Sequence, residues 1–181
     1  LASGVPFNGM FLYVLSTPAF LGDLLHLAPT QFFWFFVVNI AGIMCGAWVS
    51  GRLAGRIEPR RQVRAGYAIM VATSVANVVA NALFTAQAAW ALLPIAVYSF
   101  GWALLTPVVT LMLLDVVPER RGLASSLQAV IGSAANGIVA GALAPLVMHS
   151  ALALALASTG LMGVGLVAWA ALGRGRLAPR R

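Results

Sequence analysis

Long runs of apolar residues alternate with short polar or charged segments along the whole chain. A helix needs about 20 mostly apolar residues to cross the hydrocarbon core of a bilayer, and these runs have that length. The pattern predicts six membrane-spanning helices, at about residues 6–21, 31–50, 65–84, 90–116, 123–147 and 151–172. Pro94 and Pro107 lie inside the fourth run, where membrane helices tolerate proline and often kink.

Composition supports the prediction of a membrane protein. Hydrophobic residues make up 61% of the chain and charged residues 8%, whereas soluble domains carry about 25% charged residues. The formal net charge of +7 does not indicate a nucleic-acid binder, because no basic helix face with interleaved aromatic residues is present. Cys45 is the single cysteine, and one thiol makes neither an internal disulfide nor a metal site. We therefore predict no metal and no cofactor.

The positive charges are concentrated in three arginine-bearing segments. The first, residues 51–64, contains Arg52, Arg56, Arg60, Arg61 and Arg64. The second contains Arg120 and Arg121, and the tail contains Arg174, Arg176, Arg180 and Arg181. Six spans place all three segments on one side of the membrane and Asp23, His26 and His149 on the other. Because basic loops stay cytoplasmic, we expect both ends of the chain on the cytoplasmic side.

Two predicted spans carry small residues at intervals of four. The second span has Gly42, Gly46 and Ser50, and the fifth has Ser133, Gly137 and Gly141. Small residues at this spacing allow close helix approach. Each stripe lies in the middle span of a triplet, and the two triplets cross the membrane in opposite directions. This is the form of an inverted repeat of three plus three helices, although glycine is common in membrane helices.

Four segments carry a family resemblance: residues 10–20 (MFLYVLSTPAF), 27–32 (LAPTQF), 39–46 (NIAGIMCG) and 122–127 (GLASSL). With these segments the whole chain resembles the C-terminal six-helix half of a major facilitator superfamily transporter, of the Bcr/CflA drug–proton antiporter type. The resemblance implies an all-α membrane fold of six transmembrane helices, arranged as two inverted three-helix repeats that form half of a twelve-helix fold. The chain begins with Leu1, so we expect a fragment spanning residues 1–181 whose N-terminal half is missing.

The arginine-rich loop resembles the loop motif of that superfamily in a degenerate form. Gly51, Arg56 and the pair Arg60 and Arg61 stand at matching positions. The position of the motif's aspartate is Gly55, and the position of its second glycine is Glu58. These departures put the full charge-relay contact of the intact motif in doubt.

The resemblance also suggests where substrate binds, because the first helix of each triplet lines the cavity in that fold. The substrate-cavity candidates are Met10, Tyr13 and Thr17 on the first span, and Tyr98, Trp102 and Thr106 on the fourth. An aromatic and methionine lining suits flexible apolar compounds, but packing is the equally weighted alternative for residues at this spacing. The two small-residue stripes are expected to contact the other half of the transporter and to slide there.

Other polar residues have expected roles in packing. Asn77 and Asn81 should make interhelical hydrogen bonds. Asn39 and Asn136 should either make such bonds or line the substrate cavity. Asp115 should form an interfacial ion pair with Arg120 or Arg121, with a gating element as the alternative.

These features together predict a secondary active transporter, a drug-efflux proton antiporter of the bacterial inner membrane that works by alternating access. Its partners would be the lipid bilayer, the N-terminal half, a small amphiphilic substrate and a proton. No ionisable residue lies in the middle of a span, so the proton-carrying carboxylate is expected in the missing half. The alternatives are a truncated non-transporting remnant, or an importer or exporter of a small metabolite such as a sugar or an amino acid.

Other six-span proteins are excluded by missing motifs. An intramembrane serine protease needs a Gly-x-Ser-Gly nucleophile and a buried histidine, and the sequence has neither. An aquaporin needs two Asn-Pro-Ala motifs, which are also absent. We therefore predict no enzymatic activity and no catalytic residue.

Overall fold

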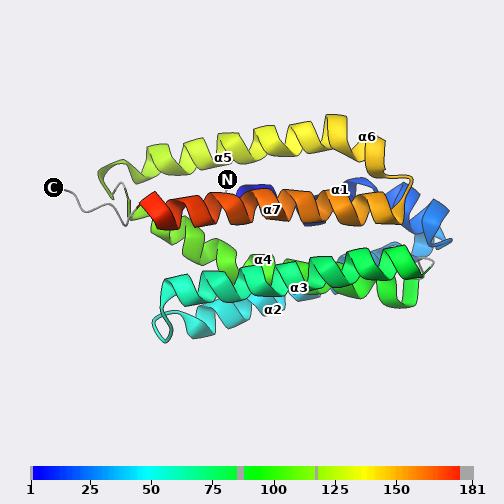
Figure 1. The fold of residues 1–181 in the computed structure, drawn as a ribbon, viewed down its shortest axis with the longest axis horizontal. Helices are drawn as coiled ribbons and strands as arrows, with labels where there is room; N and C mark the ends of the chain where they lie inside the picture. Colours follow the sequence, from blue (N-terminus) through cyan, green and yellow to red (C-terminus); the bar gives the residue numbers. More distant parts are fainter. Residues whose placement is uncertain (1, 85–87, 117, 176–181) are drawn as a thin grey trace.

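The computed structural model describes residues 2–84, 88–116 and 118–175, and the regular elements in these ranges are all helices (Figure 1). In chain order they are α1 (Gly4–Leu15), η1 (Pro18–Leu24), η2 (Pro29–Gln31), α2 (Phe33–Leu53), α3 (Pro59–Leu83), α4 (Ala88–Leu114), η3 (Pro118–Arg120), α5 (Arg121–Ile138), η4 (Val139–Leu143), α6 (Ala144–Val147) and α7 (Ala151–Gly175). Within the described residues, five helical stretches are long and apolar enough to cross a membrane. The bent pair α1–η1 makes a sixth when it is counted as one span.

The bend in the first span follows from Pro18. α1 and η1 meet at 49°, because proline has no N–H to donate to the carbonyl of Val14 four residues earlier. The Thr17 hydroxyl takes over this role, and its Oγ1 lies 2.7 Å from the Val14 carbonyl oxygen and 3.2 Å from that of Tyr13. The span therefore crosses as two helical segments with its backbone polar groups satisfied.

The arginine-rich loop is shorter than the sequence suggested. α2 continues through Leu53 and α3 begins at Pro59, so most of the arginines lie on helix ends and only residues 54–58 form the turn. Proline is well placed at the first position of a helix, where its missing N–H would have had no helical partner. Gly55 has a φ of +74° in this turn, a conformation that glycine adopts at no steric cost.

The two triplets of spans pack crosswise. α4, the first helix of the second triplet, packs against α2 and α3 of the first triplet. In the same way α1 packs against α5 and α7 of the second triplet, and the two third helices, α3 and α7, contact each other. This reciprocal packing agrees with the inverted repeat. Figure 1 shows α5 and α2 at opposite edges of the bundle, with the other helices between them.

The two ends of the bundle differ in charge. The α2–α3 turn, the α4–α5 connection and the C-terminal end of α7 lie at one end, which is the left end in Figure 1. The arginines of residues 52–64 and of residues 120–121 are therefore gathered at that end. The α1–α2 connection and the turn between α6 and α7 lie at the opposite end, with Asp23, His26 and His149. The arginines of residues 52–64 and 120–121 thus share one end of the bundle, which agrees with the arrangement expected for six spans.

Buried amide side chains join the helices inside the bundle. Gln62 on α3 donates from Nε2 to the Ser50 hydroxyl at 2.7 Å and to the Leu104 carbonyl at 3.0 Å, which links α2, α3 and α4. The Ser99 hydroxyl of α4 lies 2.5 Å from Oδ1 of Asn39 on α2. Asn39 therefore has the packing role that the sequence analysis left open for it.

Candidate functional site

A row of half-exposed side chains runs over α1, α4 and α5, and we refer to it as the open face. Its members are Phe7, Phe11 and Val14 on α1, Trp102, Thr106 and Thr110 on α4, and Gln128 on α5. On α1 the residues follow the spacing i, i+4, i+7, and on α4 the spacing i, i+4, i+8, so each set lies on one side of its helix.

Direct contacts connect the aromatic part of the open face. The Phe7 ring centroid lies 5.5 Å from that of Phe11 and 5.1 Å from that of Trp102, which joins α1 to α4. The Trp102 indole is held in place because its Nε1 donates to the Ser3 carbonyl at 2.9 Å. The three rings therefore form one fixed apolar platform.

Hydroxyl and amide groups continue the open face toward the arginine-rich end. The Thr106 hydroxyl donates to the Trp102 carbonyl at 2.7 Å, so it presents its methyl group and its remaining lone pair. The Gln128 amide donates to the Thr110 hydroxyl at 3.3 Å and connects α5 to α4. The face thus offers aromatic surface beside a few neutral hydrogen-bonding groups, and none of its seven residues is ionisable.

The structure places the six substrate-cavity candidates in two different environments. Trp102 and Thr106 belong to the open face, but Met10, Tyr13, Thr17 and Tyr98 are buried inside this chain. The predicted stripe of α1 points inward because α7 and α4 pack on that side and Asn77 of α3 reaches Tyr13, whereas Phe7 and Phe11 stay partly exposed. The Thr17 hydroxyl is in addition occupied by the backbone around Pro18.

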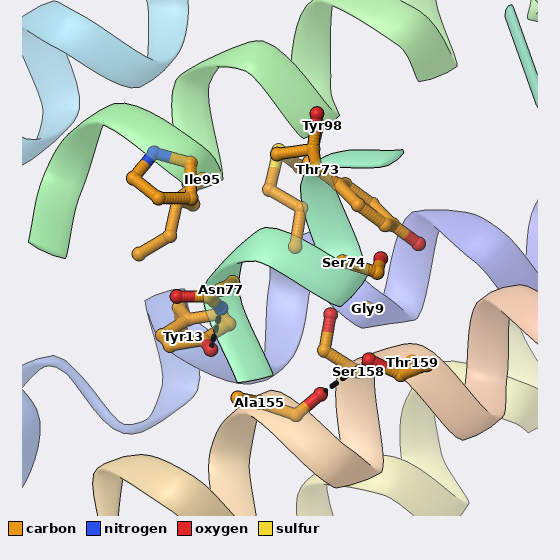
Figure 2. Close-up of a pocket in the computed structure, with 12 residues that line it drawn as sticks. Gly9, Tyr13, Thr73, Ser74, Asn77, Ile95, Tyr98, Ala155, Ser158 and Thr159 are labelled. Carbon is orange, nitrogen blue, oxygen red and sulfur yellow. Dashed lines mark hydrogen bonds between the residues drawn. The ribbon is translucent and has the colours of Figure 1, made fainter. Parts of the chain in front are cut away.

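Met10, Tyr13 and Tyr98 lie instead around a small interior cavity between α1, α3, α4 and α7 (Figure 2). Asn77 donates from Nδ2 to the Tyr13 hydroxyl at 2.8 Å, and the Tyr98 hydroxyl donates to the Pro6 carbonyl at 2.7 Å. The cavity measures about 10 Å³, which is room for about one water molecule. It is too small for an organic substrate, so these residues serve the packing of four helices.

The small-residue stripe of α2 lies against α4 of this chain. A Cβ added at Gly42 would overlap the Ala96 backbone, and one at Gly46 would meet the Phe100 carbonyl and the Ala103 side chain of α4. Ser50 is buried, and its hydroxyl accepts a hydrogen bond from the Gln62 side chain. Close packing of α2 on α4 within this chain therefore accounts for small residues at Gly42 and Gly46.

The stripe of α5 has the opposite environment. Ser133, Gly137 and Gly141 are exposed, and no atom of the described residues lies within 4 Å of a Cβ added at Gly137 or Gly141. These three residues remain available for a partner helix.

Charged residues of the predicted loop motif lie on the surface. Gly51, Arg56, Arg60 and Arg61 are exposed, and Arg61 Nε lies 3.5 Å from Glu58 Oε2. Arg121 pairs with Asp115 at 3.0 Å, as expected for an interfacial ion pair. Exposed pairs of this kind stabilise a fold by about 0–1 kcal/mol. Among the described residues there is no group of three or more His, Cys, Asp or Glu side chains that could hold a metal ion.

The sequence analysis missed five members of the open face: Phe7, Phe11, Val14, Thr110 and Gln128. Phe7 and Phe11 are four residues apart and offered a second aromatic stripe on the first span. Thr110 simply extends the stripe of Trp102 and Thr106 by one turn. Gln128 had no comparable signal, because its role depends on how α5 is placed beside α4.

Comparison with known proteins gives one match. The family model described as Major Facilitator Superfamily matches residues 1–140. No curated protein and no solved structure matches the chain.

Proposed function

Because this chain belongs to the Major Facilitator Superfamily and is therefore a multi-pass membrane transporter, we propose that it forms the C-terminal half of an efflux transporter for small amphiphilic compounds. The proposal specifies a proton antiporter of the Bcr/CflA type in a bacterial inner membrane. The sequence segments 10–20, 27–32, 39–46 and 122–127 support the assignment to the Bcr/CflA type.

The open face is the observation that carries the proposal. A substrate site needs a mostly apolar lining with a few polar groups that fix orientation, and the open face has both. Its rings are held rigidly by the contacts among Phe7, Phe11 and Trp102. A neutral aromatic surface of this kind selects for apolar or cationic amphiphiles rather than for sugars, which need many hydrogen-bonding partners.

The second half of the transporter would cover the open face and the α5 stripe. Gly137 and Gly141 would let a partner helix approach closely and repack during alternating access. The open face has no proton-carrying side chain of its own, so the proposal assigns the coupling carboxylate to the other half.

The arginine-rich end of the bundle would face the cytoplasm. Five arginines in residues 52–64 and two in residues 120–121 lie at this end, and basic loops are retained on the cytoplasmic side. This orientation places both ends of the chain in the cytoplasm.

Drug accumulation in cells tests the function. The chain joined to its N-terminal half should lower the accumulation of a fluorescent amphiphilic cation, and an uncoupler should abolish this effect. Phe11→Ala should change the relative rates for several such compounds, whereas Phe33→Ala, which removes an exposed ring of α2, should not. Efflux that survives the uncoupler would exclude proton coupling, and net uptake would favour an importer.

A further inference from the structure

A groove on the outer surface between α3 and α7 is separate from the open face. Its volume is about 410 Å³, and it is lined by Arg64, Tyr67, Ala68, Val71, Ala72, Leu166 and Trp169. α3 and α7 run next to each other in Figure 1, and both reach the arginine-rich end of the bundle. We propose that this groove binds an anionic phospholipid, with its phosphate at Arg64 and one acyl chain along the groove.

Charge at the mouth of the groove selects an anion. Arg64 is exposed, and its Nε lies 3.4 Å from the carbonyl oxygen of Arg60, one helical turn earlier on the same side of α3. In the described part of the chain, no carboxylate lies within salt-bridge distance of either guanidinium group. Like charges four residues apart on a helix repel each other, and an anionic phosphate between them removes this repulsion with charge-assisted hydrogen bonds.

The rest of the groove matches an acyl chain. Below Arg64 every lining residue is apolar or aromatic, and the small residues Ala68 and Ala72 leave the depression between the two helices. From Arg64 to Ala72 the helix rises about 12 Å, close to the roughly 15 Å of hydrocarbon in one leaflet. Trp169 is partly exposed and lies near the arginine-rich end, where aromatic side chains favour the membrane–water interface. Tyr67 forms the buried floor of the groove, and its hydroxyl donates to the Ala2 carbonyl.

A lipid fits this site better than a second copy of the chain. A two-fold contact would use the same patch on both copies and would place the two Arg60–Arg64 pairs near each other. The chain has a formal charge of +7, so the association of two such faces would be opposed by charge. A phospholipid of the leaflet at the arginine-rich end supplies both the negative headgroup and the apolar tail.

Trp169 provides the readout, because a bromine atom on an acyl chain quenches a tryptophan that it touches. The whole chain is placed in phosphatidylcholine nanodiscs with increasing amounts of dibrominated phosphatidylglycerol or dibrominated phosphatidylcholine of the same chain length. The difference between the unsubstituted chain and Trp169→Phe isolates the Trp169 signal. We expect phosphatidylglycerol to quench this signal at about fivefold lower mole fraction, and Arg64→Gln to remove that preference, since one basic residue contributes about 1 kcal/mol.

Three further variants separate the contribution of the lipid headgroup from that of the acyl chain. Ala72→Phe fills the groove and should weaken quenching of Trp169 by both lipids, whereas Ala41→Phe, on an exposed position of α2, should leave it unchanged. Arg56→Gln removes an exposed arginine outside the groove and should keep the preference for phosphatidylglycerol. Equal quenching by the two lipids, an unchanged preference in Arg64→Gln, or a second protein chain in place of lipid by native mass spectrometry would overturn the proposal.

Discussion

The side-chain amide of Asn77 donates a hydrogen bond of 2.8 Å to the hydroxyl of Tyr13 and thereby joins α3 to α1 in the interior of the bundle. Asn81, one turn further along α3, donates to Oδ1 of Asn77 at 3.0 Å. This second bond orients the Asn77 amide so that its Nδ2 faces Tyr13. The predicted interhelical bond is therefore confirmed for Asn77, whereas Asn81 acts within its own helix.

The strength of this contact can be measured with a double-mutant cycle of Tyr13→Phe and Asn77→Ala. We expect a coupling of about 0.6 kcal/mol, the average for interhelical hydrogen bonds in membrane proteins. The measurement is the free energy of unfolding of the purified chain in a detergent–denaturant titration. Tyr13→Phe combined with Ser126→Ala, on the exposed side of α5, should be additive. Additivity of the first pair would show that the bond contributes nothing to stability.

The two small-residue stripes should respond differently to a larger side chain. Gly46→Leu would overlap α4 and should reduce the unfolding free energy of the chain by about 1–3 kcal/mol. Gly137→Leu projects into open space and should leave this quantity unchanged, while it should impair transport by the complete transporter. Equal destabilisation by both substitutions would mean that α5 packs against this chain more closely than the structure shows.

We expect the Thr17 hydroxyl to stabilise the fold only because Pro18 cannot donate a backbone hydrogen bond to the Val14 carbonyl. Thr17→Val leaves the Val14 carbonyl without the hydroxyl that now bonds it, and should cost about 1–3 kcal/mol of unfolding free energy. Adding Pro18→Ala restores a backbone N–H for that carbonyl, so the double variant should recover part of the loss. A double variant that is less stable than Thr17→Val would contradict this account.

Orientation can be tested with single cysteines in a Cys45→Ala background. In intact cells, a membrane-impermeant maleimide should label His149→Cys and should not label Gly55→Cys, which lies in the turn of the arginine-rich end. Opening the cells should make both sites reactive. Labelling of Gly55→Cys in intact cells would place the arginines outside and would reverse the proposed topology.

The spans were predictable because hydrophobicity alone separates membrane helices from loops. Their faces were harder to predict, since α1 carries large apolar or aromatic residues on more than one side, and both the Tyr13 side and the Phe11 side satisfy a helical spacing. Only the positions of α7, α4 and α5 around α1 decide which side is covered. The same limit applies to the stripes, because Gly46 and Gly137 have similar sequence surroundings and differ only in whether a neighbouring helix lies against them.

The crosswise packing of the two triplets also constrains how the chain is made. Among the described helices α1 is synthesised before the others, yet it packs mainly against α7, which is synthesised after them. At translation rates of 5–20 residues per second, α1 waits on the order of ten seconds for this partner. During that interval its polar groups, such as the buried Asn8 and Tyr13, face lipid or the insertion machinery. A ribosome that stalls before residue 151 therefore leaves an unfinished chain in which α1 lacks its main packing partner.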